Sequence, residues 1–127
     1  MSRELDRHKT NPCNRQIEIQ AGEKGVGGAP IRYDIFGPRK DWGQGGMIPS
    51  FGLNMKFQQG NPADGVNGLT NEVLLAIVED RLMGFQSGQF ACEENNAALL
   101  AVQAAQSALN IRTANREARG VEGTHTV

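Results

Sequence analysis

The sequence predicts an α+β fold in which a small N-terminal antiparallel β-sheet precedes a C-terminal antiparallel helical hairpin, with the chain forming an oligomer. Three observations support this prediction. Short apolar–polar alternations fill the first half, a helical apolar stripe begins near residue 70, and residues 91–119 contain neither proline nor glycine. We expect a single domain over 1–127, with the sheet and loops in 1–65, the hairpin in 66–120 and a tail in 121–127.

Three segments of the first half have the two-residue period of a half-buried strand. In residues 15–20 and 31–36, isoleucine and tyrosine alternate with polar or charged side chains. Residues 51–58 have the clearest pattern, with one face carrying Phe51, Leu53, Met55 and Phe57. Three such strands predict a small antiparallel sheet with one apolar face.

Two other segments of the first half are expected to lie outside this sheet. Residues 1–14 are mostly polar and charged and end at the turn signal Asn11-Pro12. Residues 37–50 are rich in glycine and proline and are interpreted as a long loop. Trp42 lies in this loop, where we favour a role at an interface over a role as a stacking lid on a ligand.

The hairpin carries its own start and stop signals. Thr70 can cap the first helix, with Leu69 and Leu74 placed as a hydrophobic staple, and Gly88 is expected to end it. The second helix is rich in alanine and stops at Gly120. Alanine buries little area, so we expect the hairpin to need copies of itself. The predicted apolar stripe of the first helix consists of Leu74, Ile77, Val78, Leu82 and Phe85.

Three arginines near the end of the long helix share one helical face. Arg112, Arg116 and Arg119 recur at i, i+4 and i+7. Because cations near a helix C-terminus also complement the macrodipole, a structural role is the simpler alternative. All three positions use arginine, whose fork matches phosphate geometry in a way that lysine does not. We therefore hypothesise an anionic ligand.

Two residues near the hairpin turn are candidates for binding the rest of that ligand. Phe85 could stack on a base and Asn95 could bond to the edge of a base, although core packing is the more common role for a phenylalanine. Both lie far from Arg112 within one chain, and an antiparallel partner helix would bring the two groups together. The hypothesis thus requires a second copy.

Other parts of the sequence argue against several functions. A net charge of −1 argues against a general DNA- or RNA-binding protein. The polar start is not a signal peptide, and no apolar run reaches the length of a membrane span. We therefore expect a soluble cytoplasmic protein without a membrane partner.

No catalytic or metal site is predicted. Cys13, Cys92, His8 and His125 have no zinc-ligand spacing, and both thiols are expected to be free. Glycine-rich residues 25–28 lack the features of a phosphate-binding loop and are interpreted as a hairpin turn.

Two acidic clusters have structural interpretations. Glu93-Glu94 suits a helix N-terminus, where negative charge is stabilised. Glu79-Asp80-Arg81 is interpreted as a solvated helix face. Neither cluster predicts acid–base chemistry.

Several segments of the sequence, in combination, resemble a known family. NPCNRQIEI near the start, MKFQQG, the run VNGLTNEVLLAIVEDRLMGFQSGQFACEENNAAL, and RTANREARGVEGT near the end are similar to the Thoeris anti-defence phage proteins. These share a helical-hairpin domain with a phage anti-CBASS sponge. The resemblance spans about residues 11–126 and is strongest from residue 66 onward, whereas the loop with Trp42 departs from it.

This resemblance implies a non-enzymatic sponge in the cytoplasm of an infected bacterium. Such a protein binds cyclic nucleotide signals, chiefly glycosyl cyclic ADP-ribose made by TIR-domain proteins, without cleaving them, and it uses no cofactor. The downstream immune effector then stays inactive. Relatives assemble as homodimers or homohexamers, and we expect one of these states here. The resemblance assigns ligand binding to Phe85, Asn95, Arg112 and Arg116.

The resemblance also implies further candidate residues. Strand residues of the partner subunit would close the site, with Tyr33, Lys56 and Phe57 as candidates. Some relatives bind cyclic di- or trinucleotides at a second site near a C-terminal Gly-Thr. The corresponding residues here are Arg119, Gly123 and Thr124.

Two rival functions stay open. One is an enzyme that degrades the same signal, and recovery of intact ligand from the denatured complex would argue against it. The other is a structural or adaptor protein whose hairpin binds another helix. Replacing Arg112 and Arg116 by alanine separates this rival from a sponge, since only the sponge should lose its ligand.

Overall fold

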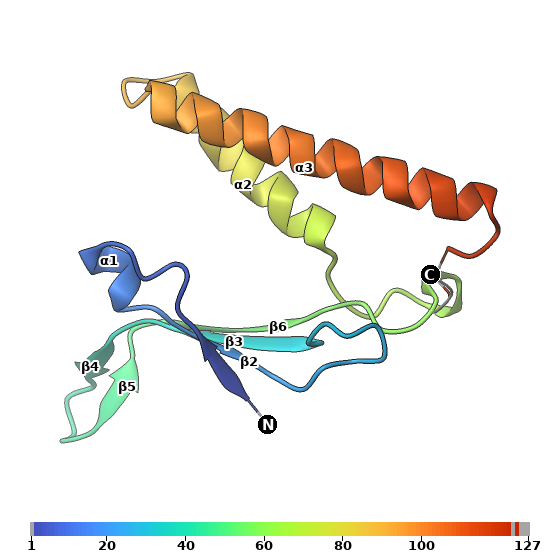
Figure 1. Cartoon of the computed structure of the whole chain (residues 1–127). Helices are drawn as coiled ribbons and strands as arrows, with labels where there is room; N and C mark the ends of the chain where they lie inside the picture. The colour runs from blue at the N-terminus through green and yellow to red at the C-terminus, as the bar shows by residue number, and fades with distance from the viewer. Residues whose placement is uncertain (1, 123, 125–127) are drawn as a thin grey trace. The chain divides into compact units, whose positions relative to one another are not determined.

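A computed structural model describes residues 2–122 and 124 of the chain. The chain divides into two compact units (Figure 1). The first comprises Met1–Gln59 and Val66–Gly68, and the second comprises Gly60–Gly65 and Leu69–Val127. The first unit contains an antiparallel sheet and the second a helical hairpin, which confirms the predicted α+β fold class.

The main sheet of the first unit has four strands, all antiparallel to their neighbours, in the order β1-β2-β3-β6. The three predicted strands are β2, β3 and β6 of this sheet. The strands are β1 (Arg3–Leu5), β2 (Glu18–Ala21), β3 (Arg32–Phe36) and β6 (Gly52–Lys56).

The register of the sheet makes one face mainly apolar and the other mainly polar. Ile19 lies opposite Ile35, and Ile35 lies opposite Leu53, so one row of apolar side chains crosses three strands. The next residues along each strand point to the other face, where the Asn54 side-chain amide donates to the Asp34 carboxylate. The predicted division into an apolar and a polar face is therefore confirmed.

Two predictions for the first half are wrong. Residues 1–14, expected to lie outside the sheet, contain the edge strand β1 and the short helix α1 (Pro12–Arg15), which is capped by Asn11. The expected loop 37–50 contains a separate two-stranded sheet, β4 (Arg39–Asp41) and β5 (Met47–Pro49). Strands of three residues are too short to display a periodic pattern, and backbone pairing holds them.

The first hairpin helix, α2, spans Asn71–Gln86 and follows the short 3₁₀ helix η1 (Pro62–Asp64). As predicted, the Thr70 hydroxyl caps α2 by accepting a hydrogen bond from the Val73 amide at 3.3 Å. Ser87 forms the C-cap, and its hydroxyl donates to the Gly84 carbonyl at 2.8 Å. Gly88 directly follows this cap, so the helix ends where the sequence predicted.

The second helix, α3, spans Glu93–Ala118 and runs back beside α2 (Figure 1). Cys92 is the N-cap of α3. Glu93 and Glu94 occupy its first turn, as predicted from the stabilisation of negative charge at a helix N-terminus. Gly120 has φ = +72°, a conformation that glycine adopts without strain, and this explains the predicted stop. The prediction of an antiparallel helical hairpin is confirmed.

A polar contact joins the two helices. The Glu79 carboxylate of α2 accepts hydrogen bonds from the Gln103 and Gln106 amides of α3, each at 3.2 Å. The interpretation of Glu79 as part of a solvated face is therefore wrong. A pattern read along one helix does not show which polar side chains the neighbouring helix offers.

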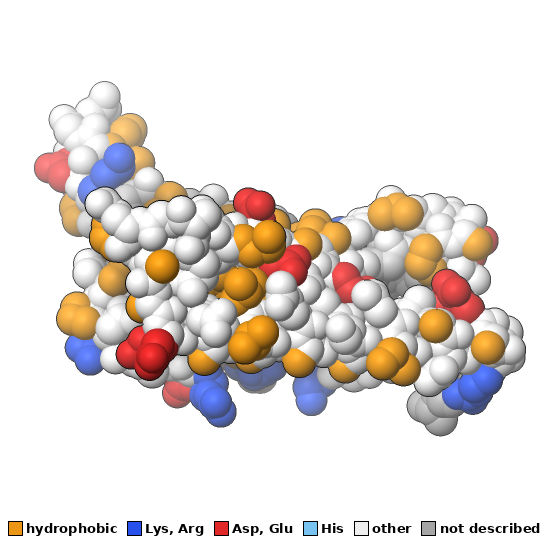
Figure 2. Space-filling view, turned by 90° about the horizontal axis from the view of Figure 1, so that it is seen from above, with side chains coloured by type: hydrophobic (Ala, Val, Ile, Leu, Met, Phe, Trp, Pro, Cys, Tyr) orange, Lys and Arg blue, Asp and Glu red, His pale blue; other side chains and the backbone are white. Residues whose placement is uncertain are grey.

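Apolar side chains stay exposed on α2 after the hairpin forms. Figure 2 shows that hydrophobic side chains are scattered over one face of the molecule. Ile77 and Val78, both members of the predicted stripe, are 53% and 44% exposed. Alanine-rich α3 offers little apolar area to cover them. The hairpin alone therefore does not bury its apolar stripe.

Candidate functional site

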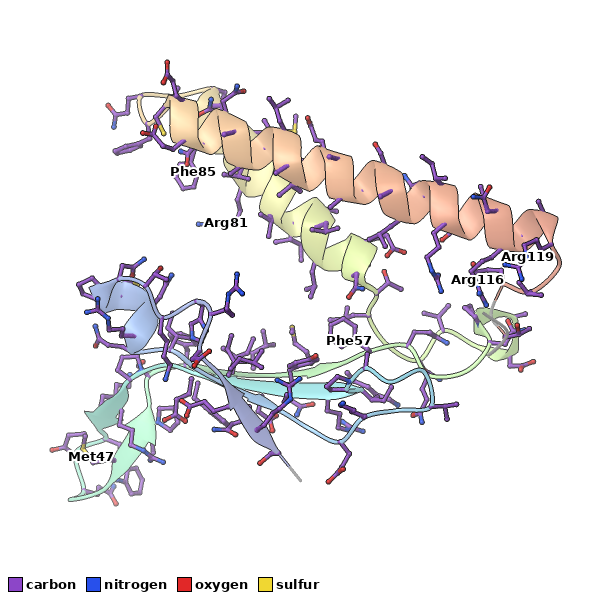
Figure 3. All side chains as sticks on the ribbon, viewed as in Figure 1. Met47, Phe57, Arg81, Phe85, Arg116 and Arg119 are labelled. Carbon is purple, nitrogen blue, oxygen red and sulfur yellow. The ribbon has the colours of Figure 1, made fainter. Side chains whose placement is uncertain are left out.

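The cationic end of α3 is built by the last two turns of that helix. Arg112 and Arg116 lie one turn apart on α3, and Arg119 is its C-cap. Gly120 then turns the chain out of the helix with a positive φ. The sequence prediction that these arginines gather at one end of the hairpin agrees with this placement (Figure 3).

Arg116 makes more contacts than its sequence position suggested. It is only 7% exposed, and its Nη2 donates to the Val121 carbonyl at 2.9 Å and to the Thr124 carbonyl at 3.1 Å. Its Nε lies 3.6 Å from Glu122 Oε2 in an ion pair. The Arg116 guanidinium therefore does not lie on an exposed cationic face. It binds the segment that follows α3.

Arg112 and Arg119 differ from Arg116 in exposure. Both are exposed, and within the described part of the chain no hydrogen bond or ion pair involves the Arg112 side chain. The Arg112 guanidinium can therefore meet an anion without first losing a hydrogen bond or ion pair to the described residues. Of the three predicted arginines, Arg112 is thus the one most open to a ligand.

Phe85 and Asn95 lie at the opposite end of the hairpin. Phe85 is in the last turn of α2 and 40% exposed, and Asn95 is in the first turn of α3. The Asn95 amide nitrogen Nδ2 donates to the Phe90 carbonyl at 3.4 Å. With 17 residues from Asn95 to Arg112, these two lie about 25 Å apart along the helix. One chain cannot hold one small ligand with both groups.

Arg81 is a neighbour of Phe85 that the sequence reasoning did not assign to the site. Its Cζ lies 5.6 Å from the centroid of the Phe85 ring, a cation–π contact (Figure 3). The two residues are at i and i+4 of one helix, and this spacing was a signal that could have identified the pair. Arg81 covers one face of a ring proposed to stack on a base.

The candidate second site is described only in part. Gly123 lies outside the described residues. The Thr124 hydroxyl donates to the Val121 carbonyl, and the Thr124 carbonyl accepts the bond from Arg116. Arg116, predicted for the first site, and Thr124, predicted for the second, are therefore in direct contact.

The strand candidates lie near the end of β6, with Tyr33 and Phe57 on one face of the sheet and Lys56 on the other. The rings of Tyr33 and Phe57 meet edge to face, with centroids 5.6 Å apart and planes at 75°. Lys56 lies opposite Arg32 across β3 and β6, which places two cations side by side. All three candidates lie in the first unit, and their part in a site stays a prediction.

The chemistry of these groups suits binding. Guanidinium groups, an aromatic ring and a side-chain amide can grip phosphates, stack on a base and bond to its edge. The two cysteines, Cys13 and Cys92, are free, as predicted, and both are exposed. Over the described residues, no helix is long and apolar enough to span a bilayer.

Known proteins resemble part of this chain. Residues 52–114 match the hairpin domain of Acb2/Tad1. Thoeris anti-defense 1 of Bacillus phage SBSphiJ7 is 49% identical over 72 residues. This match covers 56% of the chain and spans about half of the relative, 51% of its length. The residues matched to the domain include Phe85, Asn95 and Arg112, whereas Arg116 follows them.

Proposed function

This chain belongs to the Thoeris anti-defence family and carries the Acb2/Tad1 hairpin domain, and we propose that it is a phage anti-defence protein. In this proposal it binds cyclic nucleotide signals of bacterial immunity, chiefly glycosyl cyclic ADP-ribose, and sequesters them without cleavage. It would act in the cytoplasm of the infected bacterium, where the immune effector is then deprived of its signal.

One observation carries this proposal. The hairpin separates an exposed arginine, Arg112, from an aromatic ring and an amide, Phe85 and Asn95, by about 25 Å of helix. An antiparallel second copy would place the Arg112 end of one hairpin beside the turn of the other. The paired ends would then supply phosphate forks, a stacking surface and a base-edge partner in one place.

Self-association is part of this proposal. The stripe residues Ile77 and Val78 stay exposed on α2, and a second hairpin would bury them. A homodimer is the smallest assembly that completes the site, and a homohexamer is three such dimers. Tyr33, Lys56 and Phe57 of a partner subunit are proposed to close over the ligand.

A second site for cyclic di- or trinucleotides is proposed at the C-terminal end of the hairpin. It would use Arg119, Gly123 and Thr124. The observation in its favour is that Thr124 lies against Arg116, so cationic groups and this threonine occupy the same end of the hairpin.

Binding without cleavage is tested on the ligand itself. Native mass spectrometry with glycosyl cyclic ADP-ribose should give a ligand-bound oligomer, and heat denaturation should release the ligand intact. Recovery of hydrolysed product alone would favour the alternative, an enzyme that degrades the signal.

The site is tested by replacing one arginine. Arg112→Ala should weaken binding by about tenfold or more, because a hydrogen bond to a charged group is worth roughly 1.5–3 kcal/mol. Arg15→Ala is the matched control, since Arg15 is also exposed and ends a helix in the other unit. Equal affinities of the two variants would refute the site, and would leave an adaptor role for the hairpin.

A further inference from the structure

The two edges of the main sheet differ in how they resist pairing with another strand. β1 forms one edge and carries Arg3 and Glu4, and charges on an edge strand oppose pairing. β6 forms the other edge, and residues 51–55 contain neither a charge nor a proline. β6 therefore lacks the usual protection of an edge strand.

One side of the β6 backbone has no strand beside it. The Phe57 amide, directly after β6, donates to the Ile31 carbonyl, directly before β3, at 2.7 Å. Bonded residues alternate along an antiparallel pair, so the odd-numbered residues of β6 bond to β3. The backbone N–H and C=O groups of Gly52 and Asn54 point instead to the free edge, and over the described residues no hydrogen bond uses them. This edge thus offers donors and acceptors to a further strand.

The backbone groups of β6 can pair with those of a second β6. In an antiparallel pair centred on Leu53, Gly52 of each copy lies opposite Asn54 of the other, and the two exchange their free backbone hydrogen bonds. Lys56 lies opposite Ser50 in this register, so no like charges face each other. Self-pairing therefore satisfies the open edge without a cost in charge repulsion.

The same register also joins the apolar faces of the two sheets. Leu53 is 54% exposed and ends the row that runs from Ile19 through Ile35. Beside Leu53 of a second copy, this row continues across the new pair, and more of the Leu53 side chain is removed from water. Phe51 lies opposite Met55 of the other copy on the same face. The backbone edge alone would accept any extended strand, and this match of side chains selects a copy of the same chain.

We propose that the free edge of β6 is a self-association surface, on which β6 of a second copy pairs antiparallel about a two-fold axis at Leu53. This contact goes beyond the proposed function, which pairs copies through their hairpins. A two-fold contact closes at two copies, so hairpin pairing alone gives a dimer. The sheet edge is the surface that joins one such dimer to the next.

Disulfide cross-linking tests the register directly. Leu53 lies beside its own copy at a non-bonded position, where Cα atoms are about 4.5 Å apart and within reach of a disulfide. In a background of Cys13→Ser and Cys92→Ser, which removes both native thiols, Leu53→Cys should form a covalent dimer on mild oxidation. Phe51→Cys and Met55→Cys should cross-link only when the two variants are mixed. A Leu53→Cys protein that stays uncross-linked would overturn the proposal, as would a mixture that links no better than its parts.

A proline separates backbone pairing from side-chain effects. Asn54→Pro removes an N–H that does not bond to β3, so the main sheet keeps its own hydrogen bonds. Asn54→Ala is the matched control, because both variants lose the side-chain amide that binds Asp34 but only alanine keeps the N–H. Sedimentation velocity of the full chain should show smaller assemblies for Asn54→Pro than for Asn54→Ala. Asn54→Pro should also abolish the Leu53→Cys cross-link, whereas Asn54→Ala should keep it.

Equal assembly and equal cross-linking of the proline and alanine variants would show that the backbone edge takes no part, and would overturn the proposal. Circular dichroism of both variants checks that the sheet is retained. Neither measurement uses a ligand, so its outcome is independent of the binding proposed for the hairpin.

Discussion

Gln103 Nε2 of α3 donates a hydrogen bond to Glu79 Oε2 of α2 at 3.2 Å, which fixes one point of contact between the hairpin helices. Gln106 of α3 binds the other oxygen of the same carboxylate. The position is half-buried, so water only partly replaces these bonds if they are lost. In a hairpin whose long helix is rich in alanine, such a contact sets which faces of the helices meet.

Glu79→Ala should therefore destabilise the hairpin. Loss of the carboxylate leaves two amides without their acceptor, at a cost of about 1–3 kcal/mol. Urea unfolding followed by circular dichroism, at one fixed protein concentration, measures the effect. Asp80→Ala is the control, because Asp80 is the exposed neighbour on the same helix. If both variants unfold at the same urea concentration, the interhelical contact contributes nothing.

Gly68→Ala should destabilise the first unit. A Cβ at this position would collide with the backbone carbonyl of Phe57, and a backbone group cannot move aside as a flexible side chain can. We expect a loss of about 1–3 kcal/mol in the free energy of unfolding. Gly27→Ala, where an added Cβ would meet nothing, provides the comparison and should unfold like wild type.

Phe85→Ala should weaken ligand binding while leaving the fold intact. The ring is partly exposed at the hairpin turn, and stacking on a base is worth about 1–3 kcal/mol, or roughly fivefold to more than a hundredfold in affinity. Titration with glycosyl cyclic ADP-ribose measures the loss. Phe90→Ala removes a more exposed ring from the same turn and should bind normally. Loss of binding in both variants would show that binding depends on the turn as a whole and not on the Phe85 ring in particular.

Arg81→Ala tests whether the cation beside Phe85 matters to the ligand. The Arg81 guanidinium occupies one face of the Phe85 ring, so a base can stack only on the other face. Removing the guanidinium should weaken binding by about twofold to fivefold, since an exposed cation–π contact is worth roughly 0.5–1 kcal/mol. Arg81→Lys should restore part of the affinity. Wild-type affinity in Arg81→Ala would show that this contact plays no part in ligand binding.

Local signals explain why much of the hairpin could be predicted. The Thr70 cap acts on an amide three residues away, and the stop at Gly120 needs only a positive φ at one position. Both depend on residues that are adjacent in sequence. The strand at residues 51–58 was predicted for the same reason, because five of its residues are enough to display alternation.

The missed features depend on contacts that sequence spacing does not display. β1 is three residues long and is held by pairing with β2, so its own composition carries no period. Glu79 became an interhelical acceptor only when α3 supplied two glutamines. The environment of Arg116 depends on the direction that the chain takes after Gly120, and charge spacing along the helix cannot give it.

Ile77→Glu should weaken self-association more than it changes the hairpin. Ile77 is 53% exposed on α2, so a charged side chain there meets water within one chain but would be buried in a pair of hairpins. Sedimentation velocity over a range of concentrations should show an increase in the smaller species. Val26→Glu is the control, a highly exposed apolar residue of the other unit. Because the proposed site needs Arg112 from one copy and Phe85 from another, the dissociated Ile77→Glu protein should also lose ligand. A dissociated protein that still binds would show that one chain holds the complete site, contrary to the separation of about 25 Å along the helix.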